Sequence, residues 1–426
     1  KETGKAKPKV VRGEGEEQVE QAVELVDDKD LDFTKMENVY NIINKYRQQQ
    51  ISRRSLSPAQ QMEVLTIIEK AQSEKPLIKI EVLMLQISAL FSSAKLSGGD
   101  YFEREMWLET NRILGSLVDL LSVQDKETRQ PETQEDEELA EKFKFSKLTQ
   151  ILPTLVTFIE KLDQQLFKAL QVLSQGSLQY MHRLRDECLL IKQCQKIMNY
   201  LQRAGEHENR ARVGLIMLEH IYYKNDSLYE RTKKSLENKP ALLEQIYIPE
   251  EASEKVIQSL VDMILQNCQQ KFRIKAICMQ LYHLAIHNKF FEAKDLALKA
   301  KLALIIQKQK IINQIYYNRA IVQIGLAAFR LGMFEESNNV LISICQSPNL
   351  KESLAQGVSN YLRQQDKTLE EEVEEKKRFM PPHLHISIET LDCVYLITSM
   401  LQEIPNLALN KFSVQKKVLN KNFRKL

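Results

Sequence analysis

The chain has 426 residues, a formal net charge of +3 at pH 7 and a hydrophobic content of 43%. This size and apolar content exclude a generally disordered chain and allow either several cores or one long array. The near-balanced charge does not by itself indicate nucleic-acid binding, and 12 glycines and 11 prolines, about half the usual share, indicate few tight turns.

The six cysteines lie inside apolar helical patterns and show no metal-type spacing, so we expect small buried side chains in a reducing compartment. They are Cys188, Cys194, Cys268, Cys278, Cys345 and Cys393. We find no signal peptide and no apolar run of about 18 residues, which predicts a cytoplasmic protein that is neither secreted nor inserted in a membrane. Because the first residue is Lys1 rather than a methionine, we expect the chain to be part of a longer protein.

Residues 1–30 show almost no periodicity and are predicted to be an acidic disordered tail. An N-terminal helical block is expected over residues 31–122. Its clearest start signal is Ser57 at an N-cap position with Pro58 at the first helical position. Two further apolar helices are expected in this block, at Leu77–Phe91 and Trp107–Leu121.

An acidic loop is predicted over residues 123–146, because Val123–Lys142 contains eight acidic and three basic residues around Pro131. Helical repeats are then expected over residues 147–347. Two apolar ridges in this block have helical spacing. They are formed by Leu190, Cys194, Ile197 and Leu201, and by Val256, Leu260, Ile264 and Cys268. Pro249, followed by two glutamates, is predicted to open the helix that carries the second ridge.

Two segments about 44 residues apart, Ile274–Ala300 and Asn318–Ile344, repeat one design. In each, an apolar helix ends at a turn residue, an aromatic follows, and a small residue comes three positions later. The turn residues are Asn288 and Gly332, the aromatics Phe290 and Phe334, and the small residues Ala293 and Ser337. This spacing is typical of degenerate tetratricopeptide-like hairpins, and it predicts a close helix crossing at Gly325 and Ala328. Such hairpins must stack into a solenoid to bury their apolar faces, so the predicted fold is all-α, and solenoids mostly bind proteins.

A charged linker is predicted at residues 348–380, and the segment 381–426 is expected to carry a last apolar helix after Pro381 and Pro382. The final stretch contains six bases and no acid, with Phe412 and Phe423 interleaved. The bases are Lys411, Lys416, Lys417, Lys421, Arg424 and Lys425. Such a stretch could contact ribonucleic acid or an acidic partner, and the alternative is a solvated face of a terminal helix.

His383 and His385 resemble a metal-binding pair, but no nearby acid, cysteine or histidine completes a ligand set, so a capping or packing role is expected. No glycine-rich phosphate loop and no nucleophile motif occurs. Acid pairs such as Glu371 and Glu372 lie in a charged run and do not suggest general acid–base catalysis. We therefore expect neither enzymatic activity nor a cofactor.

Three segments resemble the C-subunit family of eukaryotic translation initiation factor three. They are Arg378–Ala408, which contains the run Pro-Pro-His-Leu-His-Ile, Gln314–Ile344 and Ala276–Leu298. No single motif is diagnostic, but weaker matches keep the same order along most of the chain. The resemblance implies a non-catalytic scaffold subunit that binds other subunits of that factor, especially subunit a, and the small ribosomal subunit. It also implies contact with initiation factors one and five through an amino-terminal region that we expect to be missing.

The chain ends where the family's PCI module is expected, so the main pairing surface with subunit a is predicted to lie outside it. Two alternatives remain open from the sequence alone. One is a related PCI-type helical scaffold of the proteasome lid or the signalosome, and the other is a solenoid that binds RNA directly. The second alternative requires a continuous basic face with exposed aromatic side chains.

Overall fold

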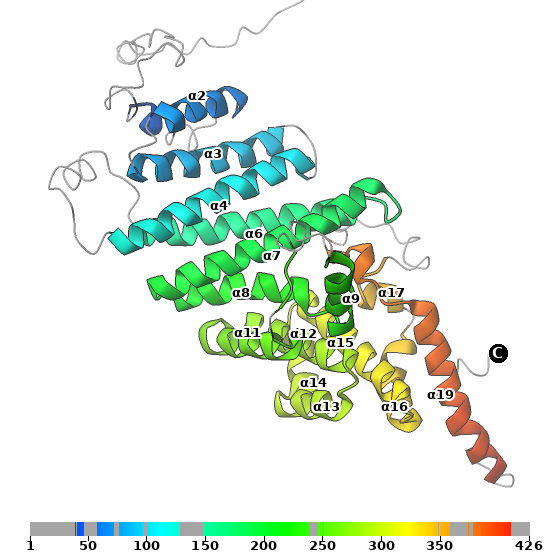
Figure 1. Cartoon of the computed structure of the whole chain (residues 1–426). Coiled ribbons are helices and arrows are strands. Elements are labelled where there is room, and N and C mark those ends of the chain that lie inside the picture. The colour runs from blue at the N-terminus through cyan, green and yellow to red at the C-terminus, as the bar shows by residue number, and fades with distance from the viewer. Residues whose placement is uncertain are drawn as a thin grey trace, which may run out of the picture.

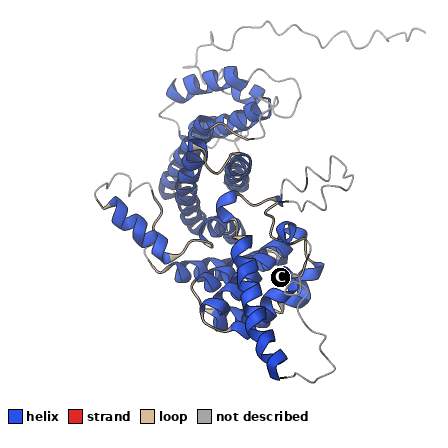
Figure 2. Cartoon of the chain, turned by 90° about the vertical axis from the view of Figure 1, so that its right-hand side faces the viewer, coloured by secondary structure: helices blue, strands red, loops and turns tan. Residues whose placement is uncertain are grey.

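The fold of the chain is all-α, as predicted (Figures 1 and 2). The computed structural model describes residues 39, 41–46, 58–71, 76–96, 101–127, 148–237, 246–249, 251–347, 349–357, 374 and 378–409. Within these residues every regular element is a helix, and no strand occurs.

The helices follow one another as successive layers of a single stack (Figure 1). Their bounds are α2 (Pro58–Ala71), α3 (Pro76–Leu96), α4 (Arg104–Glu127), α6 (Leu148–Val172), α7 (Leu178–Ala204), α8 (His207–Ile221), α9 (Asp226–Leu236), α11 (Ser253–Asn267), α12 (Gln270–Ile286), α13 (Phe290–Lys299), α14 (Leu302–Ile305), η1 (Ile306–Lys308), α15 (Ile311–Arg330), α16 (Phe334–Cys345), α17 (Leu350–Ser353), η3 (Pro382–Leu384) and α19 (Ile388–Leu409). Contacts run from α2 to α3 and α4, then through α6, α7, α8, α11, α12 and α15 to α16 and α19. Each helix thus packs mainly on helices near it in sequence, which is the arrangement of a helical solenoid.

One main hydrophobic core runs through most of this stack, and a smaller cluster joins α2 and α3 to residues 39–46. In the main core, Trp107 of α4 is fully buried, and its indole nitrogen donates a hydrogen bond to the carbonyl of Leu162 in α6 at 3.1 Å. A buried Trp needs such a partner for its N–H group. The continuous core explains why these hairpins, none of which could be stable alone, form one array.

One predicted helix start is confirmed, and two predicted boundaries are wrong. Helix α2 begins at Pro58 as predicted. Helix α4 continues to Glu127 and so enters the predicted acidic loop, because neither glycine nor proline occurs between Gly115 and Pro131. Helix α11 begins at Ser253 rather than at Pro249, and the Ser253 backbone N–H is bonded to Asp226 at 3.2 Å.

Most of the predicted charged linker and all of the basic C-terminal stretch from Lys411 to Lys425 lie outside the described residues. The segment before the last helix begins with the short η3 turn at Pro382, and α19 begins at Ile388. Helix α19 is the one helix in the described ranges that is long and apolar enough to cross a membrane. This is weak evidence for a membrane span, because core helices of water-soluble proteins meet the same criterion and α19 packs against α15 and α16.

The turns of the two predicted repeats have left-handed backbone conformations. Asn288 follows α12 with φ of 61°, and Gly332 follows α15 with φ of 77°. Glycine and asparagine adopt this conformation more readily than other residues. In the first repeat Phe290 is 1% exposed and Ala293 is fully buried.

The second repeat places α16 directly against α15 at Gly325. The Ser337 hydroxyl of α16 donates a hydrogen bond to the Gly325 carbonyl at 2.9 Å, and Ala328 is fully buried. Phe334 differs from its counterpart Phe290, because it is 40% exposed and packs edge-on against Phe329. The small residues therefore lie at the crossing itself, while the aromatic of this repeat lies at its margin.

Substituting Gly325 with alanine is expected to lower stability, whereas the same substitution at Gly214 is not. A Cβ atom at Gly325 would lie 2.5 Å from Cδ2 and 2.6 Å from Cγ of Leu341, a branched and fully buried side chain. A Cβ atom at Gly214 would lie 2.5 Å from Met263 Cε, the end of a flexible side chain. Overpacking costs about 1–3 kcal/mol, and alanine returns up to about 1 kcal/mol of helix propensity.

We therefore expect Gly325→Ala to lower the free energy of unfolding by about 1 kcal/mol, and Gly214→Ala to leave it unchanged or raise it. Urea unfolding followed by circular dichroism measures both. Equal effects of the two substitutions would contradict a tight crossing at Gly325.

Candidate functional site

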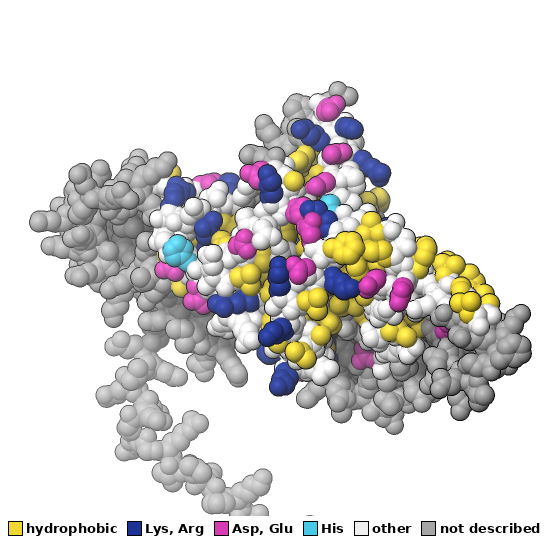
Figure 3. Space-filling model, turned by 90° about the horizontal axis from the view of Figure 1, so that it is seen from below, with side chains coloured by type: hydrophobic (Ala, Val, Ile, Leu, Met, Phe, Trp, Pro, Cys, Tyr) yellow, Lys and Arg dark blue, Asp and Glu magenta, His cyan; other side chains and the backbone are white. Residues whose placement is uncertain are grey.

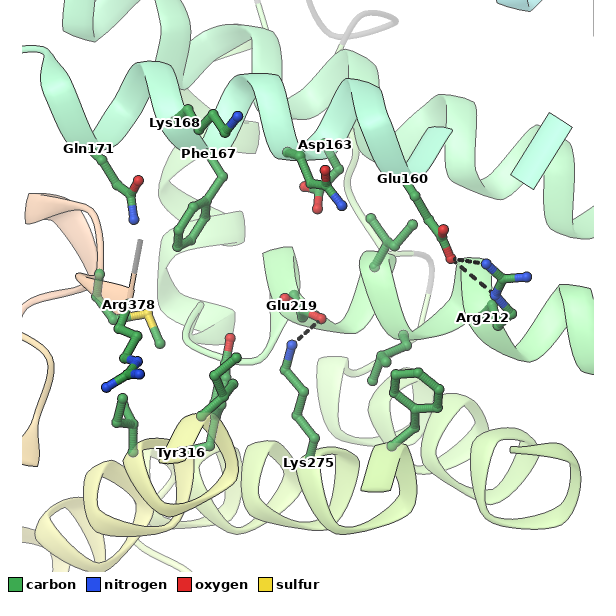
Figure 4. A pocket seen from close by; sticks show the side chains of 17 residues that line it. Glu160, Asp163, Phe167, Lys168, Gln171, Arg212, Glu219, Lys275, Tyr316 and Arg378 are labelled. Carbon is green, nitrogen blue, oxygen red and sulfur yellow. Dashed lines mark hydrogen bonds and ion pairs between the residues drawn. The ribbon is translucent and has the colours of Figure 1, made fainter. Parts of the chain in front are cut away.

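A cavity of about 500 Å³ lies between the α6–α8 layer and the α12–α15 layer (Figure 4). The segment around Arg378 and Met380 closes one end of it. The cavity thus joins parts of the chain that are far apart in sequence. A concave apolar site of this size is the usual form of a binding site.

The face of α6 toward the cavity is formed by residues with helical spacing. Glu160, Asp163, Phe167 and Gln171 follow one another at intervals of three and four, which places them on one side of the helix. Helix α8 contributes a second such stripe. It comprises Arg212, Leu215, Ile216 and Glu219. The remaining walls come from Phe272 and Lys275 of α12 and from Ile312, Ile315 and Tyr316 of α15.

Ion pairs between layers surround the apolar wall. Arg212 donates to Glu160 at 2.7 Å, joining α8 to α6, and Lys275 donates to Glu219 at 2.5 Å, joining α12 to α8. Figure 4 shows both pairs as dashed lines. These charges are satisfied within the chain, so a ligand would gain most from apolar contacts.

A buried cluster of charged side chains lies behind the cavity wall. The imidazole of His220 bonds Asp163 through Nε2 at 2.7 Å and Glu187 through Nδ1 at 2.9 Å. Glu187 also accepts hydrogen bonds from the Tyr223 hydroxyl and the Lys224 ammonium, each at 2.8 Å. The cluster therefore links α6, α7 and α8 through charge-assisted hydrogen bonds.

The pKa values of this cluster are set by burial and by the paired charges. Burial alone would lower the pKa of His220, but its bonds to Asp163 and Glu187 raise the pKa to about 10. Burial would raise the pKa of Glu187, but Lys224 and His220 hold that pKa well below its usual range. His220 is therefore a cation and Glu187 an anion at neutral pH.

The C-terminal segment returns to the stack through backbone contacts. The Gln171 amide donates to the carbonyl of Phe379 at 2.5 Å, and the Tyr180 hydroxyl accepts the backbone N–H of His383 at 3.0 Å. The guanidinium of Arg319, which is almost fully buried, donates to the carbonyl of Leu384 and to that of Leu354. These bonds hold the segment against α6, α7 and α15.

His383 and His385 have separate partners. Nδ1 of His383 lies 2.8 Å from the Tyr180 hydroxyl, and burial lowers the pKa of His383 to about 4. Nε2 of His385 lies 2.8 Å from the carbonyl of Met380. Both rings therefore serve packing and hydrogen bonding in this segment.

The cavity has the concave, largely apolar wall that is typical of a binding surface. Arg212 and Lys275 of its wall are held in ion pairs with Glu160 and Glu219. No group of three or more His, Cys, Asp or Glu suited to a metal occurs in the described part of the chain. Burial raises the pKa of Cys278 and of Cys345 to about 12, which makes both thiols unreactive. The expectation that all six cysteines are buried is wrong for Cys393, which is exposed on α19, and Cys188 is partly exposed.

Few of these residues were singled out from the sequence. The six C-terminal bases lie outside the described residues, and the residues predicted to pack the repeats lie in α13, α15 and α16, away from the cavity. The spacing of Glu160, Asp163 and Phe167 in the sequence is helical and indicates that they lie on one face of a helix. Nothing local indicates that this stripe faces Tyr316 and Arg378.

Apolar side chains also reach the surface at the far end of the stack, seen from below in Figure 3. The exposed ones include Phe291, Leu298 and Leu304 around α13 and α14, and Ile397, Leu401 and Ile404 on α19. On this face they lie among both acidic and basic side chains. Exposed apolar patches of this kind are typical of surfaces that contact other proteins.

One protein family matches nearly the whole chain, and similar proteins carry the name of the same subunit. The family described as "Eukaryotic translation initiation factor 3 subunit 8 N-terminus" matches residues 2–414. Proteins named as the C subunit of eukaryotic translation initiation factor 3 are similar over most of the chain. The protein from Coccidioides immitis is 30% identical over 86% of this chain and 44% of its own length. The Phaeosphaeria nodorum protein is 32% identical over 82% of this chain and 42% of its own length. The Xenopus laevis protein is 33% identical over 76% of this chain and 35% of its own length. The chain thus spans less than half the length of the curated relatives it matches.

The buried cluster predicts how stability depends on pH. Because the pKa of His220 is raised from 6.5 to about 10 on folding, its contribution is complete below about pH 6.5 and is lost as the pH rises toward 10. The contribution of Glu187, whose pKa is lowered, is present at neutral pH and is lost below about pH 4.5. The cluster should therefore stabilise the fold most between about pH 5 and 6.5.

Between pH 7 and 9.5, proton loss at His220 should reduce the free energy of unfolding by up to about 1.4 kcal/mol per pH unit. His220→Gln should destabilise the protein and flatten this slope. His182→Gln, at an exposed histidine of α7, should keep the wild-type slope. Urea unfolding at several pH values measures the slopes, and an unchanged slope in His220→Gln would contradict the pairing.

Proposed function

Because this chain belongs to the C-subunit family of eukaryotic translation initiation factor 3, we propose that it is a non-catalytic scaffold segment of that factor. In this role it binds other subunits of the factor and the small ribosomal subunit during initiation. A helical solenoid suits this role, because stacked hairpins offer an extended surface on which several partners can bind.

The observation that supports the proposal most is the cavity between α6, α8, α12 and α15. Its wall is apolar, and the ion pairs Arg212–Glu160 and Lys275–Glu219 leave those charges satisfied before any partner binds. An apolar side chain inserted there would be desolvated without disturbing a charge. Central pockets that accept one apolar or aromatic anchor commonly supply much of the energy of a protein interface.

The proposed partners follow from the resemblance of the sequence to the family. They are other subunits of the factor, above all subunit a, with initiation factors one and five contacted through the amino-terminal region of the whole protein. The C-terminal bases from Lys411 to Lys425 remain the sequence-based prediction for a contact with ribosomal RNA or an acidic partner.

The alternatives are less well supported. The relatives named above belong to the initiation factor rather than to the proteasome lid or the signalosome. A solenoid that binds RNA directly requires a continuous basic face, whereas the face in Figure 3 mixes Lys and Arg with Asp, Glu and apolar side chains.

Substitutions of two neighbouring isoleucines of α15 test this proposal. Ile311 and Ile312 are each 49% exposed, but only Ile312 lines the cavity. A carboxylate placed in the apolar cavity should prevent an anchor from binding, because its charge would have to be desolvated. We expect Ile312→Glu in the whole protein to reduce the recovery of partner subunits in affinity purification with quantitative mass spectrometry by about tenfold.

Ile311→Glu is the matched control and should recover partners at the wild-type level. Circular dichroism checks that both variants fold. Equal recovery by folded Ile312→Glu and by Ile311→Glu would contradict the cavity as the partner site. Loss of all initiation-factor subunits from the wild-type preparation would contradict the scaffold role itself.

A further inference from the structure

A second cavity, of about 660 Å³, lies on another part of the stack, between α7, α8, α11 and the segment 246–249. It shares no lining residue with the cavity of Figure 4. Its wall combines unpaired positive charge with methionine side chains.

Three cationic side chains line this second cavity, one from each helix. They are Lys192 of α7, Arg210 of α8 and Lys255 of α11. Among the described residues none of the three forms an ion pair, and the one acidic side chain of the lining is Glu251. Nε of Arg210 is buried and has no hydrogen-bond partner in the described structure. This cavity therefore differs from the first, whose Arg212 and Lys275 are paired with carboxylates.

Three methionines contribute to the apolar lining of this cavity, and we call them the methionine floor. Met198 of α7, Met217 of α8 and Met263 of α11 all line the cavity, together with Leu260. Gly214 lets Met263 lie against α8, because a Cβ atom there would meet the methionine methyl group at 2.5 Å. Methionine is unbranched and polarisable, so a methionine surface adapts to apolar side chains of different shapes.

We propose that this second cavity binds an acidic amphipathic segment of a partner protein. Apolar side chains of the segment contact the three methionines, and its carboxylates pair with Lys192, Arg210 and Lys255. Positive charge without internal partners favours an anionic ligand and speeds its association. The methionine floor favours a peptide over a nucleic acid, because a phosphate backbone brings no aliphatic side chain to it.

This inference deepens the scaffold role by naming the chemistry of one partner segment, and so it rests on the proposed function. The scaffold role and the binding of an acidic segment at the second cavity can be contradicted independently of each other. Loss of peptide binding with normal recovery of initiation-factor subunits would count against the second cavity alone.

The test uses two labelled helical peptides of about 18 residues, or five turns. Both carry leucines along one face, and the remaining positions are glutamate in one peptide and lysine in the other. Fluorescence anisotropy measures their binding to the whole chain, with a single-stranded RNA oligonucleotide as a third probe. We expect the glutamate peptide to bind, with an affinity that falls as salt rises, and the lysine peptide and the RNA to bind at least about tenfold more weakly.

Lys192→Glu combined with Lys255→Glu should weaken binding of the glutamate peptide by about tenfold or more. The matched control reverses two exposed lysines outside both cavities, Lys234→Glu with Lys308→Glu, and should change binding less than about twofold. Circular dichroism shows whether each variant folds, and the wild-type preference for glutamate over lysine does not depend on any variant. Stronger binding of the RNA than of the glutamate peptide, equal binding of the two peptides, or equal loss in both double variants would overturn the proposal.

Discussion

The structure depends on the buried charged cluster at the junction of α6, α7 and α8. Burying a charged side chain away from water has a large free-energy cost unless the charge is paired and hydrogen-bonded. Glu187 meets this condition only when His220, Tyr223 and Lys224 all reach it, and His220 must also reach Asp163. The rotation and register of the three helices are therefore restricted more tightly than apolar packing alone would require.

This restriction determines where the binding surfaces form. Asp163 points into the cluster, so the stripe of α6 that carries Glu160 and Phe167 faces α12 and α15 across the first cavity. The other side of α7 and α8 faces α11 and forms the second cavity. Arg319 then holds the returning segment at Leu384, which brings Arg378 and Met380 to the end of the first cavity. Two surfaces with different chemistry thus arise from one set of buried contacts.

Most of the fold could be predicted from local sequence, because helix signals are local. Proline at a first helical position predicted the start of α2, and the repeated turn residues Asn288 and Gly332 lie where each hairpin turns. The end of α4 and the start of α11 were not predicted, since charge and proline mark helix ends less reliably than hydrogen bonds do. The candidate site was largely missed. It depends on which helix faces meet, and a pairing such as Arg319 with Leu384, 65 residues apart, leaves no periodic signal.

Hydrogen–deuterium exchange of the whole protein, free and within the assembled initiation factor, tests most directly whether partners bind at the first cavity. The first turn of α15, beginning at Ile311, is informative because the first backbone N–H groups of a helix have no partner within it and exchange readily. We expect slower exchange there and in the 164–171 part of α6 when the factor is assembled, with little change in α9, which has no buried residue. Unchanged exchange at both cavity segments in the assembled factor would contradict partner binding at the first cavity.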